Sequence, residues 1–276
     1  MAPINCLPLL ISVPHGGLEV PPEVSSCCRL DLQALLRDGD TWAGYLYDFG
    51  ERVRARFQFP VARAVVDVNR AAGDRPPQNP DGVVKTVTVN DEYIWQDPAG
   101  LTGRQVKQLL DRYYYPYHAL LSAASGNRNI LLGLDCHTML ARGPDNSADS
   151  GRERPPVCLG NLGDPDGNAL DGPVSAPPEL IRALRQVLER YLKKYYHCAG
   201  IPAVQLNRPF SGGYITRKHG RAGRIPWIQL EINRSLYLIS EPRTAGPDRA
   251  ALRRIGKLKE VLFDALQDLF ATQGGE

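Results

Sequence analysis

Two short apolar runs each lead to a histidine, and they constrain the fold of this chain more than any other feature. Residues 9–13 come just before His15, and residues 130–134 come just before His137. Runs of this length, rich in Ile, Leu and Val, are typical of buried strands. Because open α/β sheets bind ligands at the carboxyl ends of their strands, both imidazoles are expected at one binding site.

The residues near these histidines suggest a metal centre. Neutral imidazole binds zinc well, and a catalytic zinc site usually has three protein ligands and one open position. Three acidic residues are candidates for the third ligand, and Asp40 is preferred over Asp38 and Glu19. In the alternative interpretation, His15 and His137 form separate hydrogen bonds and Asp40 only caps a helix. The chain has no HExxH or CxxC signature that would decide between the two.

A further apolar run, residues 225–232, contains Glu231 near its end. An unpaired carboxylate is costly to bury in the interior of a sheet. Glu231 is therefore expected at the cleft, close to the histidines.

A series of short motifs runs in order along the chain between about residues 9 and 240. Each motif is weak alone, but together they resemble the N-formylglutamate amidohydrolase family. The motifs are SVPHGG at 12–17, DGD at 38–40, LYDF at 46–49, VDVNR at 66–70, DCHT at 135–138, NRPF and GGY within 207–214, and QLEINRSLY at 229–237.

This resemblance implies a zinc-dependent amidase with a zinc-exopeptidase-like fold, in which a glutamate activates the zinc-bound water. His15, Asp40 and His137 match the metal ligands, and Glu231 matches the catalytic base. The implied reaction converts N-formyl-L-glutamate to formate and glutamate, a step of histidine degradation, and another divalent ion is the alternative to zinc. Two rival functions stay open: a carboxypeptidase-like or other N-acyl amino-acid hydrolase, and a non-catalytic small-molecule-binding protein with the same fold.

A carboxylate-bearing substrate needs cationic and amide partners. Arg70 and Arg208 are the preferred candidates, because a guanidinium group matches a carboxylate bidentately. Asn69 and Asn207, which precede them, are added as substrate-binding candidates.

Three further residues are expected to support the site without touching the substrate. A ligating histidine usually donates its second N–H to an acceptor, and Asp67 and Asp135 are candidates for that role. Arg234 lies only three residues from Glu231, so it is expected to pair with an acid within the protein.

Strands that alternate with helices predict an α/β protein, a single three-layer α/β/α domain over residues 1–276 with a mixed, mostly parallel sheet. We expect a helix from about residue 41 to 57 and a strand at 61–68. Further helices are expected from a capping box at Thr102, at 180–191 and at 252–269. The polar segments 71–100 and 141–178 are expected to be long loops that wall the cleft.

Composition excludes several classes of partner. The net charge of +3, without long basic runs, argues against nucleic-acid binding. No run approaches the roughly 20 apolar residues of a membrane span. The 6 cysteines have no paired spacing, which suits reduced thiols in a cytoplasmic enzyme, and Cys136 is expected in the core. The sequence predicts no particular oligomeric state.

Overall fold

The structure is a computed structural model, and it describes residues 6–196, 200–221 and 223–273. Its centre is a six-stranded sheet with the strand order β2-β1-β3-β6-β4-β5. The strands are β1 (Leu7–Val13), β2 (Val53–Gln58), β3 (Leu132–Met139), β4 (Val157–Gly160), β5 (Val204–Leu206) and β6 (Trp227–Asn233). Strands β2, β1, β3 and β6 are parallel, whereas β4 pairs antiparallel with β6. The predicted mixed, mostly parallel sheet is confirmed.

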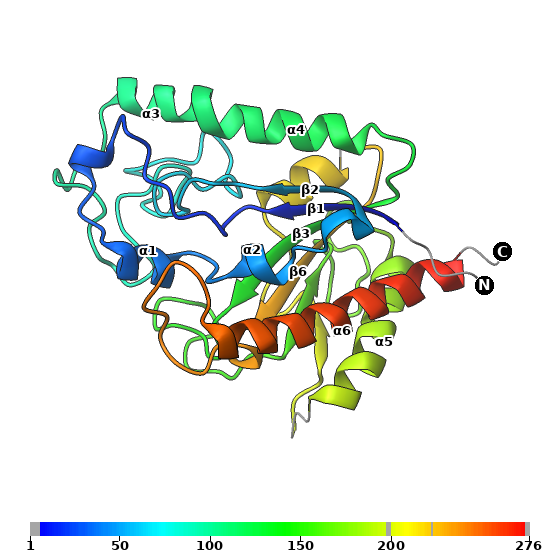
Figure 1. Ribbon diagram of the computed structural model, residues 1–276. Coiled ribbons are helices and arrows are strands. Elements are labelled where there is room, and N and C mark those ends of the chain that lie inside the picture. The colour runs from blue at the N-terminus through cyan, green and yellow to red at the C-terminus, as the bar shows by residue number, and fades with distance from the viewer. Residues whose placement is uncertain (1–5, 197–199, 222, 274–276) are drawn as a thin grey trace.

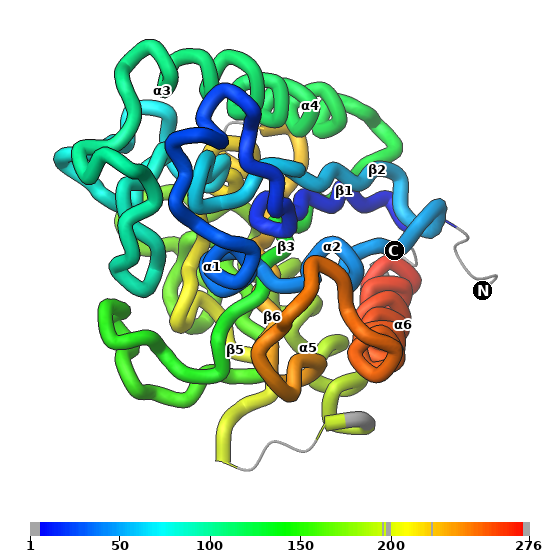
Figure 2. The backbone as a smooth tube through the Cα atoms, turned by 60° about the vertical axis from the view of Figure 1, so that its left-hand side comes forward, coloured from blue at the N-terminus to red at the C-terminus, as the bar shows by residue number. Residues whose placement is uncertain are grey.

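Helices cover both faces of this sheet, which confirms the three-layer architecture (Figures 1 and 2). One face carries α3 (Gly103–Leu109) and α4 (Tyr115–Ser125), joined by a π-helical turn, η3 (Leu110–Tyr114). The other face carries α2 (Ala43–Leu46), α5 (Pro178–Tyr195) and α6 (Arg249–Gln273). A short helix, α1 (Leu32–Asp38), lies beyond the carboxyl end of β1.

Strand alternation assigns the side chains of β1 and β3 to two different cores. Leu9, Ile11 and Leu134 pack with α5 and α6, whereas Leu10 packs with the helices of the opposite face. The expectation that Cys136 is a core residue is confirmed, since it is fully buried on the α5 and α6 side. The polar side chains of the strand ends therefore lie on the side of α3 and α4.

The expected helix at 41–57 and strand at 61–68 are wrong. The chain forms only the short α2, passes Gly50 with φ +58°, and then forms β2. Gly50 adopts a left-handed conformation that interrupts a helix, and residues 53–58 alternate apolar and polar residues as a strand does. Residues 61–68 form turns instead, and Val65 and Val66 are fully buried there.

The helices expected at Thr102, 180–191 and 252–269 are present. Thr102 forms the capping box with Gln105. The expected loop at 141–178 contains a strand, β4, that sequence analysis missed. None of the helices in the described part of the chain is both long and apolar enough to cross a membrane.

Candidate active site

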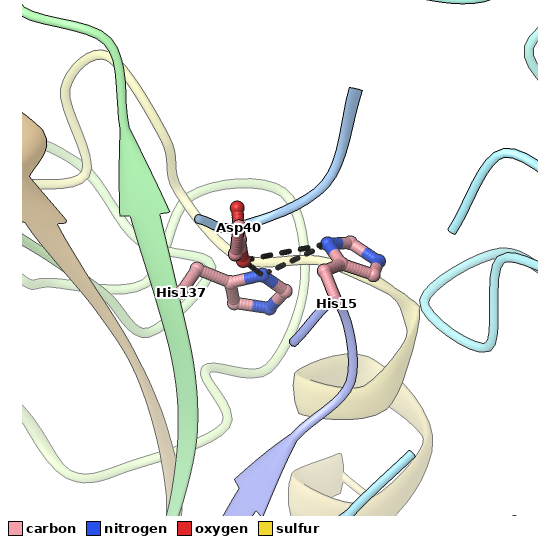
Figure 3. Close-up of side chains that lie close together, drawn as sticks. All are labelled: His15, Asp40 and His137. Carbon is pink, nitrogen blue, oxygen red and sulfur yellow. Dashed lines mark hydrogen bonds and ion pairs between the residues drawn. The ribbon is translucent and has the colours of Figure 1, made fainter. Parts of the chain in front are cut away.

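His15, Asp40 and His137 meet at the carboxyl end of the sheet (Figure 3). His15 lies in the turn after β1, His137 lies in β3, and Asp40 lies in the loop after α1. The Nδ1 atoms of the two histidines are 3.1 Å apart, and Asp40 Oδ2 lies 3.1 Å from His137 Nδ1 and 3.7 Å from His15 Nδ1. Among the described residues, this is the one group of three metal-ligating side chains whose ligand atoms lie within 4.8 Å of one another.

Local backbone contacts bring His15 and Asp40 together. The backbone N–H of Asp40 donates to the carbonyl of His15 at 2.9 Å. A Cβ atom on Gly17 would lie 2.2 Å from the carbonyl oxygen of Pro60, so only glycine fits where the chain turns after His15. Neither alternative ligand reaches this centre: Asp38 accepts the N–H of Val89, and Glu19 is exposed.

A carboxylate stands behind each histidine. Nε2 of His15 lies 2.8 Å from Asp67 Oδ1, and Nε2 of His137 lies 3.2 Å from Asp135 Oδ1. An ionised carboxylate can only accept, so His15 Nε2 is the protonated nitrogen toward Asp67, whereas His137 lies between two carboxylates, Asp135 at Nε2 and Asp40 at Nδ1. Asp67 and Asp135 thus lie behind the two imidazoles, and their supporting role stays a prediction.

The His15 tautomer leaves a lone pair on Nδ1, facing His137 Nδ1 and Asp40. With His137 Nε2 protonated toward Asp135 as well, three acceptors would converge, and a bound cation would satisfy them. Burial alone would lower the pKa of His137, but Asp135, Asp40 and Glu231 outweigh it and raise that pKa well above its usual range. Burial lowers the pKa of His15.

Arg234 fixes the Asp40 carboxylate from the other side. Its Nη2 donates to Asp40 Oδ1 at 3.3 Å and to the carbonyl of Gly39 at 2.6 Å, and its Nε donates to Thr138 Oγ1 at 3.0 Å. Burial would raise the pKa of Asp40, but the two histidines and Arg234 hold it well below its usual value. Arg234 thus pairs within the protein, as its sequence position suggested.

Glu231 lies beside His137 in the sheet, because the two residues are register partners of β6 and β3. Its side chain is buried, and Gln229 Nε2 donates to its Oε1 at 2.9 Å. Burial raises the pKa of Glu231 to about 7. A carboxyl group with such a pKa is suited to take up and release a proton near neutral pH.

A cleft of about 470 Å³ opens over these residues. Residues of both long segments line it, from Asp81 and Val89 in one to Pro144, Ser147 and Arg154 in the other. Residues of segments 71–100 and 141–178 thus lie at the cleft, and their role as its walls stays a prediction.

The candidate substrate-binding residues divide into two groups. Arg70 and Asn69 line the cleft, whereas Arg208 and Asn207 do not. Arg208 is exposed, and the buried amide of Asn207 bonds to Asn161, donating to its Oδ1 and accepting from its backbone N–H, both at 2.9 Å.

The two residues that line the cleft already have partners. Arg70 Nε donates to the carbonyl of Asp81 at 2.9 Å, and its Nη2 pairs with the carboxylate. Asn69 Nδ2 lies 3.2 Å from His137 Nε2, and its Oδ1 accepts the N–H of Ile215. Asn69 Nδ2 and Asp135 meet the same nitrogen of His137: Asn69 can donate to it when the proton is on Nδ1, and Asp135 accepts from it when the proton is on Nε2.

Sequence analysis missed three polar residues of the site. Arg63 lines the cleft and donates to Asp67 Oδ2 at 3.2 Å. Lys85 is fully buried and pairs with Asp81. Gln229 lines the cleft beside Glu231. Gln229 had a signal, because alternation along a strand gives residues 229 and 231 the same face. Arg63 and Lys85 had none, since their positions depend on how the loops fold.

Comparison with known proteins gives a consistent result. Residues 7–238 match the family model described as N-formylglutamate amidohydrolase. An N-formylglutamate deformylase of Pseudomonas putida is 28% identical over 96% of this chain and 93% of its own length. An N-formylglutamate deformylase of Pseudomonas aeruginosa is 26% identical over 84% of this chain and 82% of its own length.

The crystal structure of an N-formylglutamate amidohydrolase from Ralstonia eutropha has the same fold. It superposes with a TM-score of 0.71 at 22% identity, covering 97% of this chain and 96% of the other. Because the family model spans most of the sequence, the conclusion is direct: the chain belongs to the N-formylglutamate amidohydrolase family.

Proposed function

We propose that the protein is a metal-dependent hydrolase that cleaves N-formyl-L-glutamate to formate and glutamate. The observation that carries the proposal is the convergence of His15, Asp40 and His137 beside a buried Glu231 in one cleft. The activity named for the relatives of Pseudomonas putida and Pseudomonas aeruginosa supports this choice of substrate.

The donor set fits zinc. Ligand bonds of 2.0–2.1 Å in a tetrahedral site put the ligand atoms about 3.3 Å apart, and the three separations here are 3.1, 3.1 and 3.7 Å. His15, Asp40 and His137 would hold the ion, and another divalent metal is the alternative. When bound, the ion polarises the scissile carbonyl and lowers the pKa of a water molecule.

Glu231 moves the proton in the proposed reaction. Its Oε1 is engaged by Gln229, so Oε2 takes the proton from the attacking water as the water oxygen bonds to the formyl carbon. The same carboxyl group then delivers the proton to the leaving nitrogen as the C–N bond breaks, which releases formate and the amino group of glutamate. Proton transfer of this kind contributes about 10²–10⁴-fold to the rate.

Arg70 and Asn69 are proposed to bind the substrate, because both line the cleft. A guanidinium group beside the metal site gives a free carboxylate of the substrate a charged partner. Arg208 and Asn207 lie outside the cleft lining, so they support the proposal less. The partner of the site is thus a small carboxylate-bearing amide. The absence of a nucleic-acid partner and a cytoplasmic location stay predictions.

A substrate panel tests the proposal. We expect release of formate from N-formyl-L-glutamate, with kcat/KM at least tenfold above that for N-acetyl-L-glutamate and for glutamyl dipeptides. Preferential cleavage of the dipeptides would favour a carboxypeptidase-like enzyme instead. Binding of N-formyl-L-glutamate without turnover by the metal-loaded protein would favour a binding protein.

A further inference from the structure

Gln229 has one amide atom engaged and one atom without a partner. Its Nε2 donates to Glu231 Oε1 at 2.9 Å. Its Oε1 is buried, and no donor in residues 6–196, 200–221 or 223–273 lies within hydrogen-bond distance of it. A buried carbonyl oxygen without a donor costs free energy, so such an atom in a binding cleft indicates a ligand donor.

The position of Gln229 in the sheet explains where this oxygen lies. Gln229 of β6 is the register partner of Asp135 of β3. Two residues further along the same strands, Glu231 is the register partner of His137. Both side chains line the cleft, and Gln229 is only 4% exposed. Gln229, whose Oε1 is buried and unpartnered, is therefore part of the lining of the cleft, next to the proposed base and the carboxylate behind His137.

The orientation of the amide group follows from the charge on Glu231. When Glu231 is ionised and ready to take a proton, its Oε1 can only accept a hydrogen bond. Nε2 of Gln229 must then face Glu231, because an amide oxygen in that position would oppose the carboxylate. Oε1 of Gln229 is consequently the atom that is free to meet the substrate.

We infer that Gln229 Oε1 accepts the N–H of the scissile amide, which makes this enzyme selective for secondary amides over esters and N-substituted amides. The inference rests on the proposed function and adds a recognition element that neither the metal ligands nor Arg70 supplies. One side chain then orients both reaction partners, because Nε2 holds the base and Oε1 holds the nitrogen to which the base delivers its proton.

A double-mutant cycle between enzyme and substrate tests the inference. The formate ester of 2-hydroxyglutarate has an oxygen in place of the scissile N–H and keeps both carboxylates. The variants are Gln229→Met, which has similar length and no hydrogen-bonding atom, and Gln205→Met, the same change on the edge strand β5 away from the cleft lining. The measured quantity is the ratio of kcat/KM for N-formyl-L-glutamate to kcat/KM for the ester, corrected for spontaneous ester hydrolysis.

We expect Gln229→Met to lower this ratio about tenfold or more, because the amide loses an N–H contact that the ester never makes. Gln205→Met should leave the ratio unchanged. Misplacement of Glu231 would itself slow the amide more than the ester, because only the leaving nitrogen must be protonated, so the ratio is also measured with and without Gln229→Met in a Glu231→Gln background. A further fall there is expected from loss of the N–H contact, and an unchanged ratio in Gln229→Met in both backgrounds would overturn the inference.

Two further variants protect the test against a folding failure. Gln229→Asn keeps the buried site polar with a shorter side chain, and it should also lower the ratio. Gln229→Glu can share a proton with Glu231 and still present an acceptor oxygen, so it should keep the ratio within about threefold of the wild type. If Gln229→Glu lowered the amide-to-ester ratio as much as Gln229→Met does, the acceptor role of Gln229 would be contradicted. If the metal-loaded wild-type protein cleaves neither substrate, the proposed function fails, and that outcome is distinct from turnover with no dependence on Gln229.

Discussion

Among the histidines of residues 6–196, 200–221 and 223–273, two buried pairs are in contact, and one of these pairs has the form of a metal site. His15 and His137 approach through their Nδ1 atoms at 3.1 Å. His118 and His219 approach through Nδ1 and Nε2 at 3.0 Å, with their rings stacked at 18°. All four side chains are buried, so neither burial nor the distance between nitrogens separates the pairs.

The groups behind the rings separate them. His118 Nε2 lies 3.0 Å from the carbonyl of Val68, which can only accept, so His118 Nδ1 carries the lone pair that accepts from His219. The proton on His219 Nε2 thus completes the hydrogen bond between the two rings. Burial lowers the pKa of His118 to about 3 and that of His219 to about 4, so both stay neutral.

In the first pair, carboxylates engage both Nε2 atoms and Asp40 adds a third acceptor at the centre. With both Nε2 atoms protonated, lone pairs would face one another, and a bound cation would satisfy them. The acceptors around two histidines, more than the contact between them, therefore decide whether the pair has the form of a metal site.

The largest expected effect comes from matched substitutions in the two pairs. His137→Gln should reduce bound metal from about one equivalent per chain to background and abolish turnover, because only two ligands remain. His118→Gln should keep the metal and most of the activity. Metal analysis of the purified proteins measures this, and equal metal loss in both variants would break the comparison.

Removal of the proposed base should have the next largest effect, on kcat. Glu231→Gln keeps the shape of the side chain but cannot take a proton, so kcat should fall by about 10²–10⁴-fold while the metal stays bound. The base acts when deprotonated, and its pKa is about 7, so kcat/KM of the wild type should fall about tenfold per pH unit below that pH. An unchanged rate in Glu231→Gln would remove Glu231 from the mechanism.

Substitution of a carboxylate behind the His15–His137 pair should have a smaller effect, on metal affinity. Asp67→Asn weakens the acceptor that fixes the tautomer and orientation of His15, and such changes typically cost 10–100-fold in metal affinity. Competition with a chelator of known affinity measures the change. Asp164 follows β4 and does not line the cleft, so a matched change there, Asp164→Asn, should leave metal affinity unaltered.

Substitution of Arg70 should weaken recognition of the substrate carboxylate more than it slows the chemical step. Arg70→Met should lower kcat/KM for N-formyl-L-glutamate about tenfold relative to N-formyl-L-glutamine, since a partly exposed charged hydrogen bond to the substrate carboxylate is lost. Arg208→Met should have a smaller effect, because Arg208 does not line the cleft. Equal losses on both substrates would mean that Arg70 holds segment 71–100 through Asp81 rather than the substrate.

The positions of site residues on strands were predictable, because the apolar run that forms a strand also shows where the strand ends. The apolar runs predict His137, which follows residues 130–134, and Glu231, which lies within residues 225–232, and alternation assigns both to one face of the sheet. Asp40 could only be preferred over Asp38 and Glu19, because the loop after α1 decides which acid reaches the histidines. That loop is held by Arg234 and by the carbonyl of His15, two contacts that sequence spacing does not encode.

Helical spacing was misleading where tertiary packing uses the same residues differently. Trp42, Leu46, Phe49 and Val53 repeat as on a helix, and all four are buried. However, Trp42 precedes α2, Leu46 ends it, Phe49 lies in the connection that follows, and Val53 begins β2. The loop residues show the same limit: Arg208 looked like a substrate ligand and lies outside the cleft, whereas Arg63 gave no signal and lines it.

The smallest expected effect concerns the second histidine pair and protein stability. The pKa values of His118 and His219 in the folded protein, about 3 and about 4, lie below the ordinary value of about 6.5. The unfolded chain therefore binds more protons below pH 6.5, and stability is lost as the pH falls from there toward the folded pKa values. Each histidine should cost about 1 kcal/mol of unfolding free energy at pH 6 relative to pH 7.5.

The double variant His118→Gln/His219→Gln should lose correspondingly less stability over this range in urea unfolding, with metal content unchanged. The same pH dependence in the wild type and the variant would show that other groups are responsible for it.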